Sequence, residues 1–93
     1  MVKMENNFNM KNFKKMFEEA IDNNKKYCAI VVENSDYKKP EIIINLRENF
    51  EDKLEYYLRA YDENLVLKNC EKIKISKAIF SNNLRDIFQI IYK

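Results

Sequence analysis

Apolar residues recur along the first part of this chain with the period of a helix. Between Met10 and Asp22 they fall every three or four positions, which predicts an amphipathic helix with one buried face. Asn9 precedes this run and is placed to cap its start. Asn23 and Asn24 follow it and can adopt the left-handed conformation that commonly ends a helix, in a chain that has no glycine.

Three shorter runs have the composition of strands. Residues 26–33 contain an uninterrupted apolar run at 27–32, which predicts a central strand buried on both faces. Residues 41–44 comprise a glutamate and three β-branched isoleucines, which predicts a second strand, and the polar turn at 34–40 favours an antiparallel hairpin between these two runs. Residues 72–80 alternate between apolar and polar, so one face of this third strand should meet solvent. Lys77 breaks the alternation, and we expect a bulge there.

Two further helices complete the pattern. The second helix is predicted to begin at a cap on Asn45, where Glu48 completes a capping box, and to run through Tyr61. Its apolar face comprises Leu46, Phe50, Leu54, Tyr57, Leu58 and Tyr61. Residues 81–83 can cap a C-terminal helix whose inward positions are Leu84, Ile87, Phe88 and Ile91.

The order of these elements, α-β-β-α-β-α, predicts an α+β fold in which helices pack a three-stranded antiparallel sheet. A chain of 93 residues has room for one domain, so residues 1–93 form a single unit with residues 1–8 as a frayed N-terminal lead-in. In the connector after the second helix, Leu65 and Leu67 are expected to point inward. The predicted core comprises Phe13, Phe17, Ile21, Ile30, Val32, Ile42, Ile44, Leu54, Leu58, Ile75 and Phe88.

Composition narrows the class of protein. With 46% hydrophobic and 34% charged residues, the chain is too apolar for intrinsic disorder. Its longest apolar run, residues 27–32, is far shorter than a membrane-spanning helix, and the N-terminus lacks a signal-peptide pattern, so we expect a cytoplasmic protein with no membrane partner. Cys28 should be a buried small hydrophobe and Cys70 a spectator thiol, both reduced. Whether they ever pair is left open.

Missing residue types exclude several chemistries. The chain has no histidine, which removes Ser/His and Cys/His dyads and the common zinc sites. It also has no glycine, which removes the phosphate-binding loop and the dinucleotide fingerprint. Carboxylate, tyrosine or lysine chemistry remains open, but no pattern indicates it. We therefore expect a protein that is not an enzyme and that uses no cofactor or metal.

Acidic residues are concentrated on the second predicted helix. Their spacing places them on the side opposite its apolar residues. A solvated helix face is the simplest interpretation. The functional interpretations are a docking surface for a basic partner, a surface that imitates the phosphates of nucleic acid and, third, paired carboxylates for a divalent metal ion. Four acids on one exposed helix would bind such an ion weakly without ligands from another element. The candidate partner-binding residues are Glu48, Glu51, Asp52, Glu55, Arg59 and Asp62.

Lysines are concentrated at the third strand, although the net charge of +2 implies no particular partner. These lysines can bind phosphate, or they can protect an edge strand from pairing with other chains. An aromatic residue with two lysines in the hairpin loop is a second basic element. The candidate nucleic-acid residues are Tyr37, Lys38, Lys39, Lys68, Lys72, Lys74 and Lys77.

Five short segments in the middle of the chain form a recurring combination: Ile43–Asn45, Glu48–Phe50, Lys53–Tyr57, Ala60 with Tyr61, and Asn64–Lys68. In this combination the chain resembles small proteins carried by phages and prophages of low-GC Gram-positive bacteria. The resemblance covers about a third of the chain, within residues 42–68, and implies a phage context without assigning any activity or site residue.

These observations favour a non-enzymatic phage or prophage accessory protein that acts by stoichiometric binding. The expected partner is a protein of the bacterial host, such as a CRISPR nuclease or another defence effector. The alternative is a small nucleic-acid-binding regulator that uses the basic residues between Lys68 and Lys77. A homodimer is also left open.

Overall fold

A computed structural model describes residues 8–91, without the side chains of residues 90 and 91. It confirms the α+β fold and the predicted order of elements. These elements are α1 (Met10–Asp22), β1 (Tyr27–Asn34), β2 (Glu41–Leu46), the 3₁₀ turn η1 (Arg47–Asn49), α2 (Phe50–Ala60), β3 (Ile73–Ser81) and α3 (Leu84–Ile91).

The three strands form one antiparallel sheet in the order β2-β1-β3. The central place of β1 follows from its unbroken apolar run, because only a central strand covered on both faces can bury every side chain. Its pairing with β3 shifts register between Val31 and Val32, which face Lys77 and Ile75. Ser76 is the extra residue, so the bulge expected beside Lys77 is confirmed.

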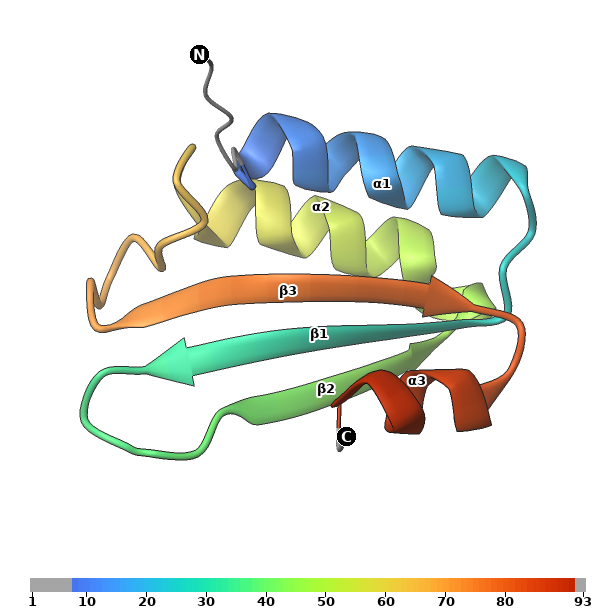
Figure 1. The fold of residues 1–93 in the computed structure, drawn as a ribbon. Coiled ribbons are helices and arrows are strands. Elements are labelled where there is room, and N and C mark those ends of the chain that lie inside the picture. Colours follow the sequence, from blue (N-terminus) through green and yellow to red (C-terminus); the bar gives the residue numbers. More distant parts are fainter. Residues whose placement is uncertain (1–7, 92–93) are drawn as a thin grey trace, which may run out of the picture.

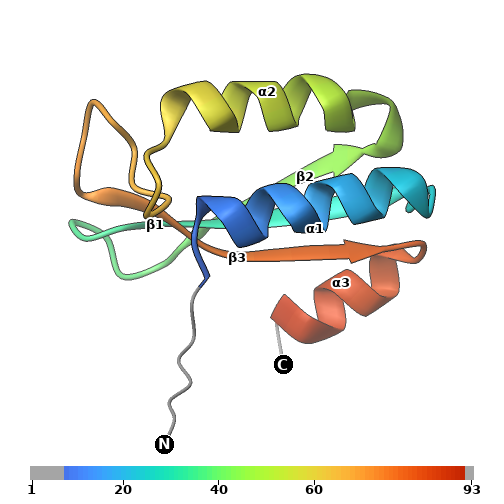
Figure 2. The same ribbon diagram turned by 90° about the horizontal axis from the view of Figure 1, so that it is seen from above.

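Helices cover the two faces of this sheet unequally (Figure 1). Both α1 and α2 lie on one face, which we call the two-helix face, and α1 contacts α2 along its length (Figure 2). On the opposite side, the one-helix face, the short helix α3 contacts β3 and β1. The two-helix face therefore holds the larger part of the core.

Aromatic rings fill the space between the two helices and the sheet. The ring of Phe17 lies 5.1 Å from that of Phe13, 5.9 Å from that of Phe50 and 4.9 Å from that of Phe80, all edge to face. Tyr57 of α2 joins the cluster at 5.5 Å from Phe13. Such pairs contribute about 0.5–1.5 kcal/mol each beyond the burial of their surface. This cluster fixes α1 and α2 against the sheet.

The predicted helix ends are confirmed at three asparagines. The Asn9 side chain accepts a hydrogen bond from the Asn12 N–H at 3.0 Å and caps α1. Asn24 has a φ of 56°, the left-handed conformation expected after α1. The Asn83 side chain accepts from the Arg85 N–H at 2.8 Å, where α3 begins. Asparagine residues therefore define the starts of α1 and α3 and the end of α1, in a chain without glycine.

The predicted start of the second helix was wrong. Asn45 does not cap it, because β2 continues through Leu46 and η1 follows before α2 begins at Phe50. Asn45 is buried, pairs with Cys28 of β1 and faces Tyr57 of α2, whereas Leu46 is exposed in the strand. The backbone of Arg47 also donates to the Lys26 carbonyl at 2.9 Å. Pairing with β1 therefore extends the strand through a segment that carries a capping pattern.

Two predicted core residues are exposed. Ile44 is 38% exposed because it lies on the one-helix face, which α3 covers only in part. Phe88 is 41% exposed and lies on α3 itself. Six of the remaining predicted core residues are buried: Phe13, Phe17, Ile30, Val32, Leu54 and Ile75. The other three are partly buried: Ile21, Ile42 and Leu58. Leu65 is fully buried and Leu67 packs against the core, as expected.

Two predictions concern the chain ends. The inward side chain of Ile91 and the lead-in at residues 1–7 lie outside the described residues. Phe8 is described, and it was assigned to the lead-in. It is partly buried, and its ring lies edge to face with that of Phe13 at 6.2 Å.

Candidate functional site

The acidic face of α2 is formed as the sequence predicts. Phe50, Leu54 and Tyr57 turn into the core, which leaves the opposite side of the helix to solvent. Glu51, Asp52, Glu55 and Arg59 are exposed on this helix, and Glu48 is exposed in η1 just before it. We call Glu48, Glu51, Asp52 and Glu55 the acidic face. Helical spacing alone is sufficient to gather these carboxylates.

One carboxylate of the acidic face is already paired. The Arg47 Nη1 donates to Glu51 Oε1 at 2.9 Å, and the guanidinium lies 5.7 Å from the centre of the Phe50 ring. This hydrogen bond lowers the pKa of the Glu51 carboxyl. Within residues 8–91 no ion pair engages Glu48, Asp52 or Glu55. These three carboxylates are therefore the ones available to a partner.

Asp62 does not belong to the acidic face, contrary to the prediction. It lies two residues beyond the end of α2 and is only partly exposed. Its Oδ1 accepts from the Asn64 N–H at 2.8 Å and from the Val66 N–H at 3.0 Å. The carboxylate thus holds the turn in which Leu65 takes a φ of 64° and is fully buried. Asp62 has a structural task in the connector.

The predicted basic residues are divided among several places. Tyr37, Lys72 and Lys74 line one hollow of about 320 Å³, together with the acidic residues Glu33 and Glu71. The Lys72 Nζ is 3.2 Å from Asp36 Oδ2, so its charge is partly balanced. The hollow gathers loop and strand residues, but its charge is mixed.

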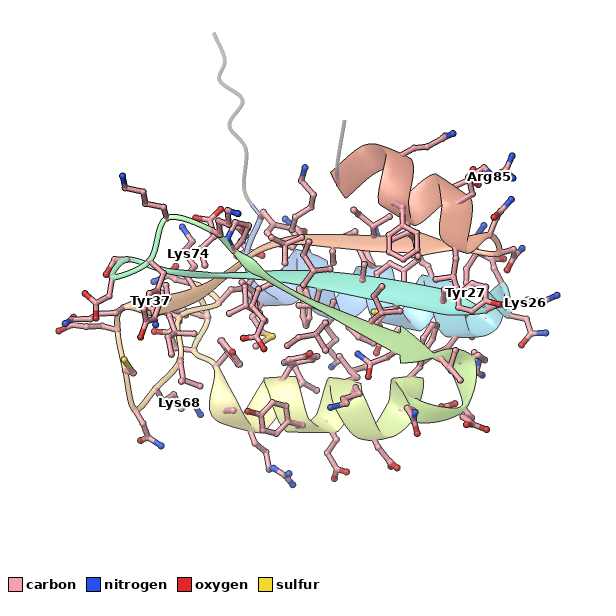
Figure 3. The ribbon with its side chains drawn as sticks, turned by 90° about the horizontal axis from the view of Figure 1, so that it is seen from below. Lys26, Tyr27, Tyr37, Lys68, Lys74 and Arg85 are labelled. Atoms are coloured by element: carbon pink, nitrogen blue, oxygen red, sulfur yellow. The ribbon has the colours of Figure 1, made fainter. Side chains whose placement is uncertain are left out.

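The other lysines lie apart from this hollow. Lys68 lines a separate hollow that also contains Asp62 and Glu63. Lys77 is exposed opposite Val31, on the one-helix face, beyond the bulge. Figure 3 shows Tyr37, Lys68 and Lys74 at one end of the molecule, and Lys26 and Arg85 at the other end. The structure does not form a continuous basic strip from Lys68 to Lys77.

The hairpin loop presents its aromatic residue to solvent. Tyr37 is 72% exposed, and Lys38 and Lys39 beside it are exposed as well. The loop is held by Asn34, whose carbonyl accepts from the Tyr37 N–H at 2.9 Å and whose side chain accepts from the Asp36 N–H, also at 2.9 Å. It is joined to β3 by a hydrogen bond of 3.0 Å from the Ser35 N–H to the Lys72 carbonyl.

An apolar part of the one-helix face was missed by the sequence reasoning. Ile44 and Leu46 of β2 are 38% and 47% exposed, and Ile42 beside them is partly buried. A signal was present, because three successive isoleucines in a strand must place side chains on both faces. One short C-terminal helix cannot cover the whole of the second face. These residues form an exposed apolar row along β2.

The two cysteines are free thiols. Burial raises the pKa of the Cys28 thiol from its ordinary 9.0 to about 12, so this group stays protonated at neutral pH. Cys28 therefore packs as a small apolar side chain, and it does not supply a nucleophile. Cys70 lies in the connector and is partly exposed.

Within the described part of the chain, no group of three or more acidic or thiol side chains is arranged to hold a metal ion. The same residues include no helix that is long and apolar enough to cross a membrane. Comparison with protein-family models, with curated proteins and with solved structures found no match to this chain.

Proposed function

We propose that this chain is a non-enzymatic phage or prophage accessory protein that binds a protein of the bacterial host stoichiometrically. The observation that carries the proposal is the acidic face, where Glu48, Asp52 and Glu55 are exposed and have no ion pair within residues 8–91. They are presented by a helix whose opposite side is fixed in an aromatic core. A rigid helix loses little conformational entropy when it docks.

The charge of this face indicates the kind of partner. Carboxylates along one helix side are complementary to a basic surface, and such complementarity raises the rate and the specificity of association. Defence nucleases of the CRISPR type hold nucleic acid in a positively charged channel. A surface that imitates phosphates can compete for such a channel. The resemblance to phage-carried proteins supports this choice of partner and an action in the cytoplasm of the host.

Affinity capture of the tagged chain from host lysate, followed by titration of the captured protein, tests the proposal. The titration should saturate at a fixed ratio of chains. The charge reversal Asp52→Lys with Glu55→Lys should weaken binding by about tenfold or more. The matched control is Glu18→Lys with Glu19→Lys, which makes the same change on the exposed side of α1 and should leave binding intact.

Two results would contradict the proposal. One is equal loss of binding in both double variants, which would indicate a response to net charge alone. The other is the absence of any retained partner, together with no protection of phage by the gene in a host that carries an active defence system.

Nucleic-acid binding is the second candidate, and it is favoured by one observation. Tyr37 and Lys74 line the same hollow, so an aromatic ring and a cation lie close enough to stack on a base and to contact its phosphate. The hollow also contains two carboxylates that would repel phosphate, those of Glu33 and Glu71. The charge of Lys72 is partly balanced by its ion pair with Asp36. This mixed charge ranks nucleic acid below a protein partner.

Electrophoretic mobility shift at low salt separates the two candidates. If Lys74 and Lys77 contact two phosphates of duplex DNA, the logarithm of the binding constant should fall with the logarithm of salt concentration at a slope of about −2. A shift that Lys74→Glu abolishes, and that Asp52→Lys with Glu55→Lys leaves unchanged, would reverse our ranking. No shift at micromolar protein would remove the nucleic-acid candidate.

A further inference from the structure

The outer edge of β2 is the most open part of the sheet. Within residues 8–91, β2 pairs with β1 on one side and with no strand on the other. Seen from the one-helix face, β2 crosses in front of the sheet (Figure 3), while α3 lies towards β3 and contacts β3 and β1. A second chain can therefore approach the β2 edge from this side.

Alternation along the strand shows which backbone groups face outward. The Arg47 N–H donates to the Lys26 carbonyl at 2.9 Å, so this pair of residues is hydrogen-bonded between the strands. In an antiparallel ladder every second residue points its backbone groups to the same side. Residues 41, 43 and 45 consequently face β1 as well, and Ile42, Ile44 and Leu46 direct their N–H and C=O groups away from the sheet.

The two edges of the sheet differ in their protection against pairing with another chain. Along β3, Lys74 and Lys77 are exposed, Ser76 is bulged, and Val66 forms a bridge with Lys74. Lysines, bulges and covering segments are the devices by which proteins block edge pairing. Between residues 41 and 46, β2 has no lysine, no proline and no bulge. The β2 edge therefore lacks these features that block pairing with another strand.

We propose that β2 is a homodimer interface, in which a second copy of this chain pairs antiparallel with it about a two-fold axis at Ile44. In this register Ile44 lies opposite the partner's Ile44, and Ile42 lies opposite the partner's Leu46. Each outward N–H donates to an outward C=O of the partner strand, and the two exposed apolar rows join on the one-helix face. The two three-stranded sheets become one sheet of six strands.

Charge complementarity favours a second copy over an unrelated strand. The same register places Glu41 opposite the partner's Arg47, and the two-fold axis repeats this pair at the other end of the strand. Glu41 is exposed, and Glu51 engages only the Nη1 group of Arg47, which leaves other guanidinium donors for a carboxylate. Opposite charges directly across antiparallel strands stabilise their pairing. The strand is therefore complementary to itself.

Sedimentation equilibrium of the purified chain tests this inference. We expect twice the 11.3 kDa mass of one chain. Ile44→Lys places two ammonium groups against each other at the two-fold axis and should give the mass of a monomer with an unchanged circular dichroism spectrum. Phe88→Lys is the matched control, because Phe88 is 41% exposed but lies on α3; this variant should remain dimeric. A monomeric wild-type chain throughout the micromolar range would overturn the proposal.

Cysteine cross-linking in a Cys70→Ser background tests the register, and it does not depend on the lysine variant. Across a hydrogen-bonded pair the Cα atoms lie about 5.5 Å apart, within the range of a disulfide, so Ile44→Cys should cross-link to itself under mild oxidation. Ile42→Cys should not, because its equivalents lie about 13 Å apart in this register. Chains with Ile42→Cys and chains with Leu46→Cys should cross-link when mixed. Self-cross-linking by Ile42→Cys without any by Ile44→Cys would overturn the register.

This inference stands apart from the proposed host partner. Sedimentation and cross-linking use the purified chain alone, and the reversal of Asp52 and Glu55 should leave the dimer intact. A monomeric chain that still binds its partner through the acidic face would overturn the dimer only. A dimeric chain without a partner would overturn the proposed function only.

Discussion

The two faces of the sheet are made by the same three strands but are buried to very different extents. On the two-helix face, Phe17 is fully buried among four aromatic rings contributed by α1, α2 and β3. On the one-helix face, α3 buries Ile87 against β3 and β1, and β2 remains exposed. One face is a closed core, and the other presents an apolar row to solvent.

Adjacent residues of β2 show what decides this difference. Ile43 packs against the core, whereas Ile44, of identical chemistry, is 38% exposed. Side chains of successive strand residues point to opposite faces, so the position of the covering helices determines burial. The comparison predicts that equivalent substitutions have unequal effects on the two faces.

Phe17→Ala should produce the largest loss of stability. It removes a ring at the centre of the two-helix core and should lower the free energy of unfolding by about 3–5 kcal/mol. Phe88→Ala removes the same ring from the one-helix side, where the residue is 41% exposed, and should cost less than about 1 kcal/mol. Urea denaturation of both variants measures the difference. Similar losses in the two would contradict the contrast between the faces.

Leu54→Ala compares the two sides of one helix. Leu54 is buried beneath α2, and its truncation should cost about 2–5 kcal/mol. Tyr56→Ala alters a larger side chain that is 44% exposed on the same helix, and should cost less than about 1 kcal/mol. Thermal and urea unfolding should agree on this order. An unchanged urea midpoint for Leu54→Ala would contradict the orientation of α2.

At Leu65 the glycine variant should be more stable than the alanine variant, which reverses the usual order of stability in a helix. Both substitutions lose the burial of the leucine side chain, but at a φ of 64° glycine avoids the left-handed penalty of roughly 1–2 kcal/mol. Leu65→Gly should therefore be the more stable of the two variants. At Leu54, inside a regular helix, Leu54→Gly should be the less stable by about 1 kcal/mol. The same order at both positions would show that the left-handed backbone at Leu65 carries no strain.

Alkaline pH should weaken the two-helix core. Burial raises the pKa of Cys28 from 9.0 to about 12, so above pH 9 the unfolded state releases this proton before the folded state does. The contribution of Cys28 to stability is complete below pH 9 and is lost as the pH rises towards 12. Burial also raises the pKa of Tyr57 and Tyr61, which act in the same direction.

The variant Cys28→Ala removes the thiol. Between pH 8, about 1 unit below the ordinary thiol pKa of 9.0, and pH 11, about 2 units above it, its urea midpoint should fall less than that of the wild-type chain. Because the charge on Cys28 contributes to the raised pKa of Tyr57, the difference between the two proteins also includes a change at this tyrosine. A parallel decline of the two midpoints would show that the thiol titrates normally in the folded state.

Local patterns predicted the elements whose evidence lies within a few residues. The apolar stripe of α1 and its Asn9 cap, and the unbroken apolar run of β1, are confirmed. The acidic face is likewise confirmed as exposed, because residues on one helix share a face wherever the helix packs, whereas the predicted member Asp62 lies outside it and is only partly exposed. The task of Asp62 in the connector depends on a turn whose backbone the residue pattern did not reveal.

At Asn45, pairing with a strand that is distant in sequence overrides a local helix-capping pattern. The segment carries a capping pattern, but its backbone pairs with β1, from Cys28↔Asn45 to the hydrogen bond between Arg47 and Lys26. These ladder bonds keep the segment extended up to Leu46, so α2 starts later than predicted. The partner that extends β2 beyond Ile44, strand β1, lies in another part of the chain.

The sequence alone determined the class of fold, the order of the elements and the charge on each of them, because periodicity and capping depend on neighbours along the chain. Only the tertiary structure decided which strand edge is open, where α3 leaves the sheet uncovered, and that Tyr37 and Lys74 line one hollow while Lys68 lines another and Lys77 lies on the one-helix face. These outcomes depend on how elements dock across long separations in sequence. Docking is set by the packing of whole surfaces, and no short window of residues contains that information.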